Sequence, residues 1–455
     1  MSSAGATASE RDRVRDLVLR HGWNATAFQA LESGYQYFFH GAEACVAYVD
    51  TGRAWVAAGA PIAHIEELGG AVSAFVQAAR AAGKRACFFA SEERLRASTG
   101  EALRSLNIGE QPAWDPRGWN ATLAQRRSLR EQLRRARAKG MLVRELSPTE
   151  LERGPTHEAL ARIAERWLHS RVMAPMGFLV RLEPFAFPAE RRCFVAEVAG
   201  QVIAFAGVIP VPLRRGWFLE DLVRDPNAPN GTSELLVDAV MRWANETGSQ
   251  WLTFGLAPLA GNLPRWLRFI RRSAGFLYDF EGLRAYKAKF RPDSWSPIFL
   301  SYPARQNQLV SIADALAAFA PGGLVRFAWR SLLRGPRVVL GVLATLLVPW
   351  TLLLALVPAA PWFHASWVKW AWVCFDICVA LALLRMLRKP ATRLLTALCL
   401  AVTADAVVTT VEAVFWNLTR ARGVVPYLVL ALACGAPTLA AIVLWGARQH
   451  RFRTL

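Results

Sequence analysis

The hydrophobic pattern of the chain changes near residue 337. Before this point, short apolar runs alternate with polar turns and amphipathic segments, which is typical of an α/β fold. After it come four apolar stretches of membrane-spanning length, at 338–357, 362–384, 394–415 and 424–445. We therefore predict an α/β region followed by an all-α module of four transmembrane helices, at 338–447.

The charges around these apolar stretches predict their orientation. The opposite loops hold only Arg420 and Arg422, with Lys369 nearby. Basic residues precede the first stretch, separate the second from the third, and end the chain: Arg330, Arg334, Arg337, Arg385, Arg388, Lys389, Arg393, Arg448, Arg451 and Arg453. The positive-inside rule places the α/β region and both termini, including a short tail at 448–455, in the cytoplasm of a multi-pass membrane protein.

Three carboxylates lie within or near the apolar stretches: Asp376, Asp405 and Glu412. An ionised carboxylate is costly in a bilayer unless it is paired or hydrated, which makes such residues candidates for function. Two interpretations remain open. The acids form a polar path or lipid-headgroup site between helices, or they make hydrogen bonds from helix to helix.

The composition adds an anionic partner to this picture. The formal charge is +19, from 54 Lys and Arg against 35 Asp and Glu, and 53% of the residues are apolar. This balance favours nucleic acid or anionic lipid as a partner. The seven cysteines are scattered without a CxxC pair or Cys/His cluster, so we expect neither a disulfide framework nor a metal site. The polar amino-terminal segment lacks the apolar core of a signal peptide.

The α/β region contains a loose internal repeat. The stretches 45–62 and 193–211 each show an apolar strand, a Gly-containing turn and a second apolar strand, the pattern of a β-hairpin. A helix, a glycine and another strand follow each hairpin at different distances. We predict two α/β units of one design, at 1–125 and 126–305, and a basic juxtamembrane linker at 306–337.

The first candidate site is the segment FLEDLVRDPNAPNGTSELL, residues 218–236. The first residues of this segment predict a strand that ends in charged side chains. Strand alternation places Glu220 and Asp221 on opposite faces of the strand. Arg224 follows where the strand ends. The plain alternative is a surface pair of Arg224 with Asp225 before a capped helix.

The loop after this strand predicts an anion site. Its prolines stop the strand, Asn230 and Gly231 lead into a helix, and Thr232 or Ser233 is the expected N-cap. A helix amino terminus offers free N–H groups and the positive end of the helix dipole to a phosphate or carboxylate.

The second candidate is YDFEGLRAYKAKFRP, residues 278–292, in which charged and aromatic residues are interleaved. Such a segment can bind an anionic, partly stacked ligand such as the end of an RNA. It is equally compatible with an ordinary edge strand. The polar residues concerned are Glu281, Arg284, Lys287 and Lys289.

The third candidate is RRSLREQLRRARAKG, residues 126–140. On a helix, Leu129 and Leu133 form a packing stripe beside a basic stripe. The basic face is either simply solvated or contacts an RNA backbone or an anionic membrane. The stripe consists of Arg127, Arg130, Arg134 and Arg137.

Together these segments resemble a known family. The two-unit plan, FLEDLVRDPNAPNGTSELLVDAVMRWA, GLAPL and FEGLRAYKAKFRP are similar to the catalytic region of bacterial aminoacyl-phosphatidylglycerol synthases. That region consists of tandem acetyltransferase-like (GNAT) domains. The resemblance extends over residues 15–303 and is most specific at 217–303. The best-known members carry their membrane helices before the catalytic region, whereas this chain carries them after it, and it lacks the R-x-x-G-x-G pattern of acyl-CoA-binding relatives.

The resemblance implies an aminoacyltransferase of the bacterial inner membrane. It would move an aminoacyl group from aminoacyl-tRNA to a hydroxyl of an anionic phospholipid such as phosphatidylglycerol, without a cofactor. An ester donor is already activated, so a base and a cation suffice. The family's D-x-x-R and final lysines correspond to Asp221, Arg224, Lys287 and Lys289. We hypothesise Asp221 as base or amine anchor, Arg224 as orienter, the lysines as contacts for the tRNA end or lipid phosphate, and Glu281 as a contact for the substrate amine.

Two other functions remain open. The chain is an acyl-CoA-dependent N-acyltransferase that makes an amino-acid-containing lipid, or it is a membrane-tethered RNA or lipid binder without activity. Ribonuclease treatment distinguishes the first alternative from tRNA-dependent transfer. Lipid analysis distinguishes the second, because a binder produces no new aminolipid.

Overall fold

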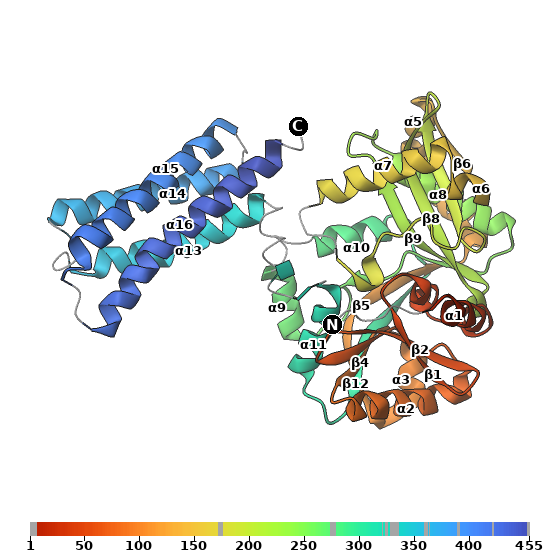
Figure 1. Ribbon diagram of the computed structural model, residues 1–455. Coiled ribbons are helices and arrows are strands. Elements are labelled where there is room, and N and C mark those ends of the chain that lie inside the picture. The colour runs from red at the N-terminus through yellow and green to blue at the C-terminus, as the bar shows by residue number, and fades with distance from the viewer. Residues whose placement is uncertain are drawn as a thin grey trace. The chain divides into compact units, whose positions relative to one another are not determined.

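The chain forms two compact units in the computed structural model (Figure 1). An α/β domain contains residues 1–170 and 175–324, and a helical domain contains residues 171–174 and 325–455. Arg330, Arg334, Lys389, Arg422 and Arg453 lie outside the described residues, so the membrane topology remains a prediction. The structure describes residues 7–171, 176–273, 279–320, 322–323, 326–327, 336–358, 363, 365–388, 392–420 and 423–452.

A sheet of 12 strands forms the centre of the α/β domain. The first five are β1 (Gln36–His40), β2 (Ala44–Asp50), β3 (Ala54–Ala58), β4 (Arg85–Ser91) and β5 (Leu103–Trp114). The rest are β6 (Met141–Glu145), β7 (Arg192–Val198), β8 (Gln201–Val211), β9 (Gly216–Arg224), β10 (Trp251–Thr253), β11 (Ala257–Pro258) and β12 (Ser294–Pro303). The order is β1-β2-β3-β4-β12-β5-β10-β9-β8-β7-β6, with β11 paired to β5.

The two halves of the α/β domain exchange their last strands. β12, from the second half, lies between β4 and β5 and is antiparallel to both. β5, from the first half, pairs in turn with β10 of the second half. The predicted α/β fold is confirmed, and its two units share one continuous sheet.

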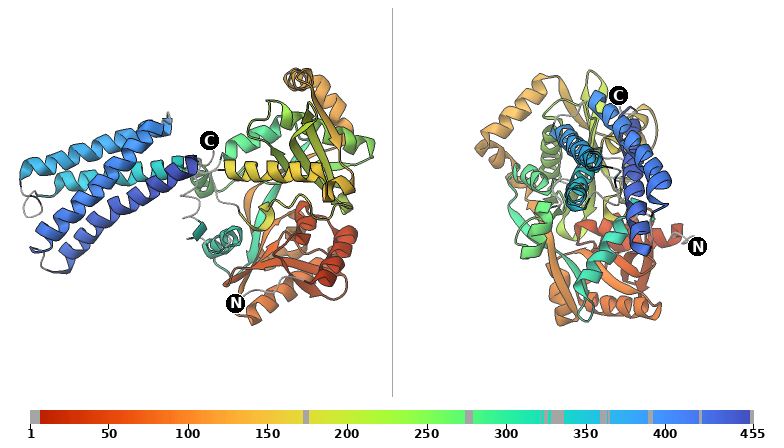
Figure 2. Two further views of the ribbon diagram at one scale, coloured as in Figure 1. Left: turned by 45° about the horizontal axis from the view of Figure 1, so that its top comes forward. Right: turned by 90° about the vertical axis from the view of Figure 1, so that its left-hand side faces the viewer.

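Helices cover both faces of this sheet (Figure 2). Successive residues of β7 alternate between two apolar cores, one that contains residues of α7 (Pro155–Ser170) and one that contains residues of α8 (Thr232–Glu246). Because side chains alternate between the two faces of a strand, these helices lie on opposite faces of the second half of the sheet. α2 (Leu68–Ala81) and α3 (Glu93–Thr99) pack beside the first half. The other helices here are α1 (Ala8–His21), α4 (Trp119–Gln125), α5 (Arg127–Ala138), α6 (Pro148–Glu152), α9 (Arg265–Ser273), α10 (Phe280–Ala288) and α11 (Gln308–Phe319).

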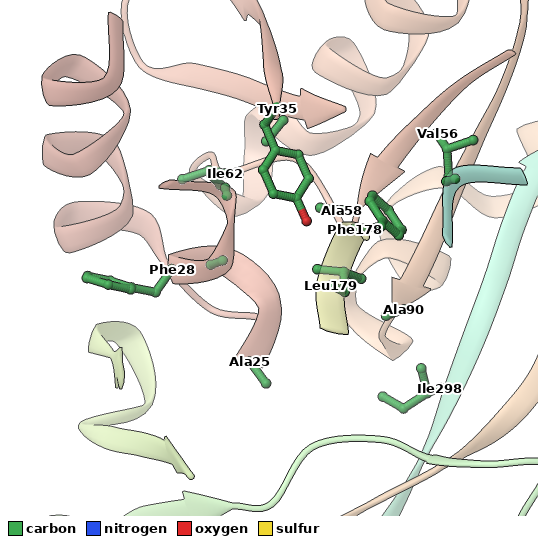
Figure 3. Close-up of a cluster of buried hydrophobic side chains, with 14 of the residues drawn as sticks. Ala25, Phe28, Tyr35, Val56, Ala58, Ile62, Ala90, Phe178, Leu179 and Ile298 are labelled. Atoms are coloured by element: carbon green, nitrogen blue, oxygen red, sulfur yellow. The ribbon is translucent and has the colours of Figure 1, made fainter. Parts of the chain in front are cut away.

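One apolar core joins segments that are far apart in the sequence (Figure 3). It packs Phe28 and Tyr35 of the first half against Phe178 and Leu179, and it includes Ile298 of the exchanged strand β12. Burial of side chains from both halves in one core stabilises their association, because apolar surface is removed from water on both sides.

In both halves a helix joins two parallel strands, but the predicted alignment of the hairpins is wrong. In the first half the helix α2 follows β3, and in the second half α8 follows β9. The hairpin equivalent to β2–β3 is therefore β8–β9, whereas the sequence matched β2–β3 with β7–β8.

Two predicted segments take a different form from the one expected. The edge-strand interpretation of 278–292 is wrong, because Phe280–Ala288 is the helix α10, capped by the Asp279 carboxylate at 2.7 Å from the N–H of Gly282. The predicted linker begins with α11, which belongs to the α/β domain. Asp314 of α11 accepts two hydrogen bonds from Arg85, at 2.6 and 2.7 Å.

The helical domain places helices at the four predicted spans. These are α13 (Pro336–Leu356), α14 (Ser366–Arg388), α15 (Thr392–Glu412), which continues into the π-helical turn η7 (Ala413–Asn417), and α16 (Val424–Phe452). Within the part of the chain that the structure describes, three stretches are long and apolar enough to cross a membrane: Ser366–Met386, Arg393–Asn417 and Pro426–Gly446. The corresponding stretch of α13 among the described residues, Leu343–Leu356, is shorter.

Candidate functional site

A β-bulge in the middle of β9 builds the candidate site. Leu219 pairs with Val208 and Asp221 pairs with Gly207, which leaves Glu220 as an extra residue in β9. A bulge re-aims the side chains beside it. The prediction that alternation separates Glu220 from Asp221 is therefore wrong, because both carboxylates reach one guanidinium group.

That guanidinium group belongs to Arg191, the residue before β7. Its Nη1 lies 2.7 Å from Oε2 of Glu220 and 3.1 Å from Oδ2 of Asp221. The side chains of Arg191, Glu220 and Asp221 are only 2%, 5% and 8% exposed. Gly207 makes room for this pair, since a Cβ at this position would lie 3.1 Å from both Nη1 of Arg191 and Oδ2 of Asp221.

A third buried carboxyl group, Glu32, joins this cluster from the first half of the domain. It follows the short helix Ala25–Leu31, and it interacts with Glu220. Burial, and then the charge of Glu220, raise the pKa of Glu32 far above its ordinary value, so Glu32 is protonated at neutral pH. Tyr35 lies close to the same two acids, and its buried hydroxyl has no hydrogen-bond partner among the described residues.

Asp221 is the member of this cluster that titrates near neutrality. Burial raises its pKa to about 7, the charge of Glu220 adds to this, and Arg191 opposes it. A carboxylate with a pKa near the working pH is suited to accept a proton, because both of its forms are populated.

The site lies where two parallel strands separate. β9 and β10 pair from Gly216↔Trp251 to Phe218↔Thr253, and β9 then continues past Glu220 and Asp221 paired with β8 alone. The backbone that continues β10 is held by Lys287 of α10. Its Nζ donates to the carbonyl oxygens of Phe254, Gly255 and Leu256, at 2.7, 2.9 and 2.9 Å.

Lys287 thus has its three donors directed to the protein backbone. Burial lowers its pKa to about 7, whereas the three carbonyl acceptors favour its charged form. This geometry supports a positioning role in place of the predicted contact with the tRNA end or lipid phosphate.

The other predicted residues of α10, and Lys289 directly after it, lie in separate contacts. Lys289 binds Oε1 of Glu234 at 2.8 Å, and Arg284 binds Oε1 of Glu110 at 2.6 Å. Glu281 is 75% exposed, and its Oε1 lies 3.5 Å from Nε of Arg271. None of these three contacts involves a residue of the Arg191 cluster.

None of the acids of the Arg191 cluster lies in the loop after β9. Arg224 is exposed, and its Nη1 lies 3.4 Å from the carbonyl oxygen of Ala228. Asn230 is exposed, and the N-cap of α8 is Gly231, with φ +99, in place of the predicted Thr232 or Ser233. The first turn of α8 contains Glu234, whose buried carboxylate already complements the helix dipole.

The predicted basic helix exists as α5, with Leu129 and Leu133 buried as expected. Its arginines differ in what they contact. Arg137 binds the buried Asp238 at 2.5 Å, Arg134 binds Glu131 at 2.6 Å, and Arg130 donates to the carbonyl oxygen of Leu123. Arg127 is exposed.

Arg191, Glu32 and Tyr35 are the functional candidates that the sequence did not reveal. Arg191 is 30 residues from Asp221, and Glu32 lies in the other half of the domain. No local spacing links these residues. Among the described residues, no group of three or more His, Cys, Asp or Glu is placed to hold a metal ion.

Comparison with known proteins gives consistent matches for the α/β domain. The family described as "Phosphatidylglycerol lysyltransferase, C-terminal" matches residues 15–302. The phosphatidylglycerol lysyltransferase of Bacillus subtilis (strain 168) is 31% identical over 165 residues, 34% of this chain and 19% of that protein. The lysylphosphatidylglycerol biosynthesis bifunctional protein LysX of Nocardia farcinica (strain IFM 10152) is 26% identical over 313 residues, 63% of this chain and 27% of that protein.

Solved structures show the same fold. The C-terminal DUF2156 domain from Agrobacterium fabrum has a TM-score of 0.61 at 25% identity, over 70% of this chain and 100% of that one. L-PGS from Bacillus licheniformis has a TM-score of 0.60 at 19% identity, over 70% of this chain and 97% of that one. The matched segments of the two curated relatives are only 19% and 27% of their lengths. Because the family model matches more than half of the chain, the protein belongs to the phosphatidylglycerol lysyltransferase C-terminal family.

Proposed function

We propose that this chain is a membrane-bound aminoacyltransferase that moves an aminoacyl group from aminoacyl-tRNA to a hydroxyl of an anionic phospholipid such as phosphatidylglycerol. The observation that carries the proposal is the buried Asp221, with a pKa near 7, beside Arg191 at the point where β9 leaves β10. The family match and the apolar helices support a lipid acceptor.

The proposed reaction needs one proton acceptor. The lipid hydroxyl oxygen attacks the ester carbonyl carbon and forms a new C–O bond, and the C–O bond to the terminal ribose of the tRNA breaks. Asp221 accepts the hydroxyl proton and returns it to the leaving ribose oxygen. Arg191 orients Asp221, and Lys287 holds the backbone beyond β10 in place.

The donor and the location are further parts of this proposal. The exposed Arg127 and the neighbouring basic residues of α5 would contact the tRNA backbone, because phosphate contacts dominate nucleic-acid affinity. The three membrane-length stretches would anchor the chain in the bacterial inner membrane, with the α/β domain and both termini in the cytoplasm.

Reconstitution tests the proposed reaction. The full chain in phosphatidylglycerol vesicles receives a lysyl-tRNA donor, and mass spectrometry follows the lipids. We expect a lysyl-lipid product whose formation stops when ribonuclease removes the donor before mixing. A product that survives ribonuclease, or one that forms only with an acyl-CoA, would contradict the proposed donor.

A further inference from the structure

Two of the membrane-length stretches each carry an aspartate at their centre. Asp376 of α14 lies ten residues from each end of Ser366–Met386, and Asp405 of α15 lies twelve residues from each end of Arg393–Asn417. A residue in the middle of a spanning stretch lies near the middle of the hydrocarbon core. An ionised carboxylate is most costly at this depth, so both aspartates are candidates for function.

The packing of α14 against α15 brings the two aspartates to one level. α14 ends at Arg388 and α15 begins at Thr392, and so short a connection makes the helices antiparallel neighbours. Residues at equal distances from the connection then lie opposite each other. Three such pairs are buried in one apolar core: Met386 and Leu395, Leu383 and Leu398, Val379 and Val402. Asp376 and Asp405 are the next pair, about one helical turn farther out, and they interact electrostatically.

The two carboxyl groups differ in burial and in hydrogen bonding. Asp376 is only 6% exposed, and its Oδ2 has no hydrogen-bond partner among the described residues. Asp405 is half-buried, and its Oδ1 accepts a hydrogen bond from the Thr409 hydroxyl at 3.1 Å. A hydrogen bond to a carboxylate favours its charged form, whereas burial without a partner disfavours it. The negative charge therefore belongs on Asp405, and a proton belongs on Asp376.

The described helices place no basic side chain at the level of this pair. Lys369, about two turns before Asp376 on α14, donates from Nζ to the carbonyl oxygens of Ala355 and Val357, at 2.8 and 2.6 Å. The arginines at the end of α14 and the start of α15 are at least nine residues from the aspartates. The charged side chains of α13 and α16 lie only near the helix ends, at Arg337, Arg448, His450 and Arg451.

The other titratable side chains of these helices supply no positive charge. Glu412 is an acid, about two turns beyond Asp405 on α15. The thiols, which are neutral at pH 7, belong to Cys374, Cys378, Cys399 and Cys434. Two interacting carboxylates without a cation cannot both be ionised in a medium of low dielectric constant, so the pair retains a proton.

We propose that Asp376 and Asp405 form a proton-binding site at the centre of the helical domain, in which the pair holds one proton. Of the two interpretations of the acids in the apolar stretches, the proposal favours a polar site for these two. Loss of the proton breaks the O–H bond of Asp376 and leaves two negative charges between α14 and α15. Their repulsion makes the packing of these helices depend on pH.

The test is labelling of the full chain in phospholipid vesicles with dicyclohexylcarbodiimide, an apolar reagent that modifies protonated carboxyl groups. Peptide mass spectrometry measures the label on each residue. For an ordinary aspartate, with a pKa of about 3.9, the protonated fraction falls by about 100-fold between pH 5 and pH 7. The label on Asp376 should fall by less than about tenfold over this range. A larger fall overturns the proposal, whatever any variant does.

Matched variants then test the pairing. Asp405→Asn removes the neighbouring charge, so the label on Asp376 at pH 7 should fall at least about threefold below that of the unmodified chain. The label at pH 5 should stay the same, which shows that the reagent still reaches an intact site. Glu412→Gln, at the other acid of α15, is the control and should change the label at neither pH. An unchanged label at pH 7 in Asp405→Asn, or an equal fall in the control, overturns the pairing of Asp376 with Asp405.

A change of cation distinguishes a proton from a metal ion. Sodium in place of choline, at equal ionic strength and pH 7, should leave the label on Asp376 unchanged. Protection by sodium alone would show that the pair binds a metal cation, and would overturn the assignment to a proton. Because no aminoacyl donor is present, failure of the proposed transfer reaction leaves all of these results unchanged.

Discussion

The two halves of the α/β domain contain the same parallel strand pair, with different endings. β3 and β4 stay in register over five pairs, from Ala54↔Arg85 to Ala58↔Phe89, and the strand end is apolar and buried. β9 and β10 pair over three residues and then separate, and β9 bulges where Glu220 and Asp221 meet Arg191. The β3–β4 pair ends in an apolar core. The separation of β9 from β10 instead leaves strand backbone and charged side chains that can take part in a reaction.

The difference shows what a strand separation requires. Glu220 and Asp221 bring charge into a buried region where β9 has separated from β10, which is costly without a partner. Arg191 supplies that partner, and Gly207 leaves space for it. Glu32 belongs to the first half, where the strands β3 and β4 stay paired, and it joins the same cluster. The first half therefore contributes to a site that is built around the separated strands of the second half.

The largest expected effect comes from removing the proposed base. Asp221→Asn keeps the size of the side chain but cannot accept the proton, so single-turnover transfer should fall by at least about 100-fold. Asp225→Asn, farther along the chain at a residue paired with the exposed Arg166, is the control and should retain transfer within about threefold. Equal loss in both variants would show that the site is not at Asp221.

Removal of the Arg191 guanidinium group tests how much it stabilises the region where β9 and β10 separate. Arg191→Met leaves two buried carboxylates without their cation, which should lower the local unfolding free energy by about 3–5 kcal/mol. Arg192→Met is the control, because Arg192 is 40% exposed and 3.9 Å from Glu145, and it should cost less than about 1 kcal/mol. Native-state hydrogen exchange of the β7–β9 amides in the full chain measures both.

A smaller effect follows from filling the space beside the cluster. Gly207→Ala puts a methyl group 3.1 Å from Arg191 and Asp221, which should cost about 1–3 kcal/mol and slow transfer by displacing Asp221. Gly118→Ala, where a Cβ meets nothing within 4 Å, should change neither quantity. Unchanged transfer in Gly207→Ala would mean that the position of Asp221 is not critical.

The smallest effect concerns the basic face of α5. Replacement of Arg127 and Arg134 by alanine should weaken aminoacyl-tRNA binding and reduce the slope of log affinity against log salt by about 1 per lost phosphate contact. Transfer at saturating donor should stay the same. Arg153→Ala, an exposed arginine outside this helix, is the control. An unchanged salt slope in the double variant removes α5 from the tRNA site.

Much of the fold could be predicted from periodicity. The apolar runs of β2, β3, β7 and β8, the apolar helices and the leucine stripe of α5 are local patterns, and the structure contains them. The exchange of β5 and β12 could not be predicted, because strand order depends on contacts between distant segments. The segment 280–288 was ambiguous because its interleaved residues satisfy a strand and a short helix alike.

The candidate site was predictable only in part. Glu220 and Asp221 stand out as acids at the end of an apolar strand. Their joint contact with Arg191 depends on a bulge opposite Gly207. The bulge could not be predicted from the alternation of side chains along one strand. Lys287 stood out as a basic residue, but its three backbone acceptors come from a loop 31 to 33 residues away.

The pH dependence of transfer tests the central claim most directly. The proposed base works only when ionised, and burial raises the pKa of Asp221 to about 7. Single-turnover transfer, corrected for spontaneous hydrolysis of the ester, should therefore rise with pH through about 7 and level off above it, and Asp221→Asn should lose this inflection. A profile that is flat from about pH 6 to 8, or an inflection that persists in Asp221→Asn, would contradict proton transfer by Asp221.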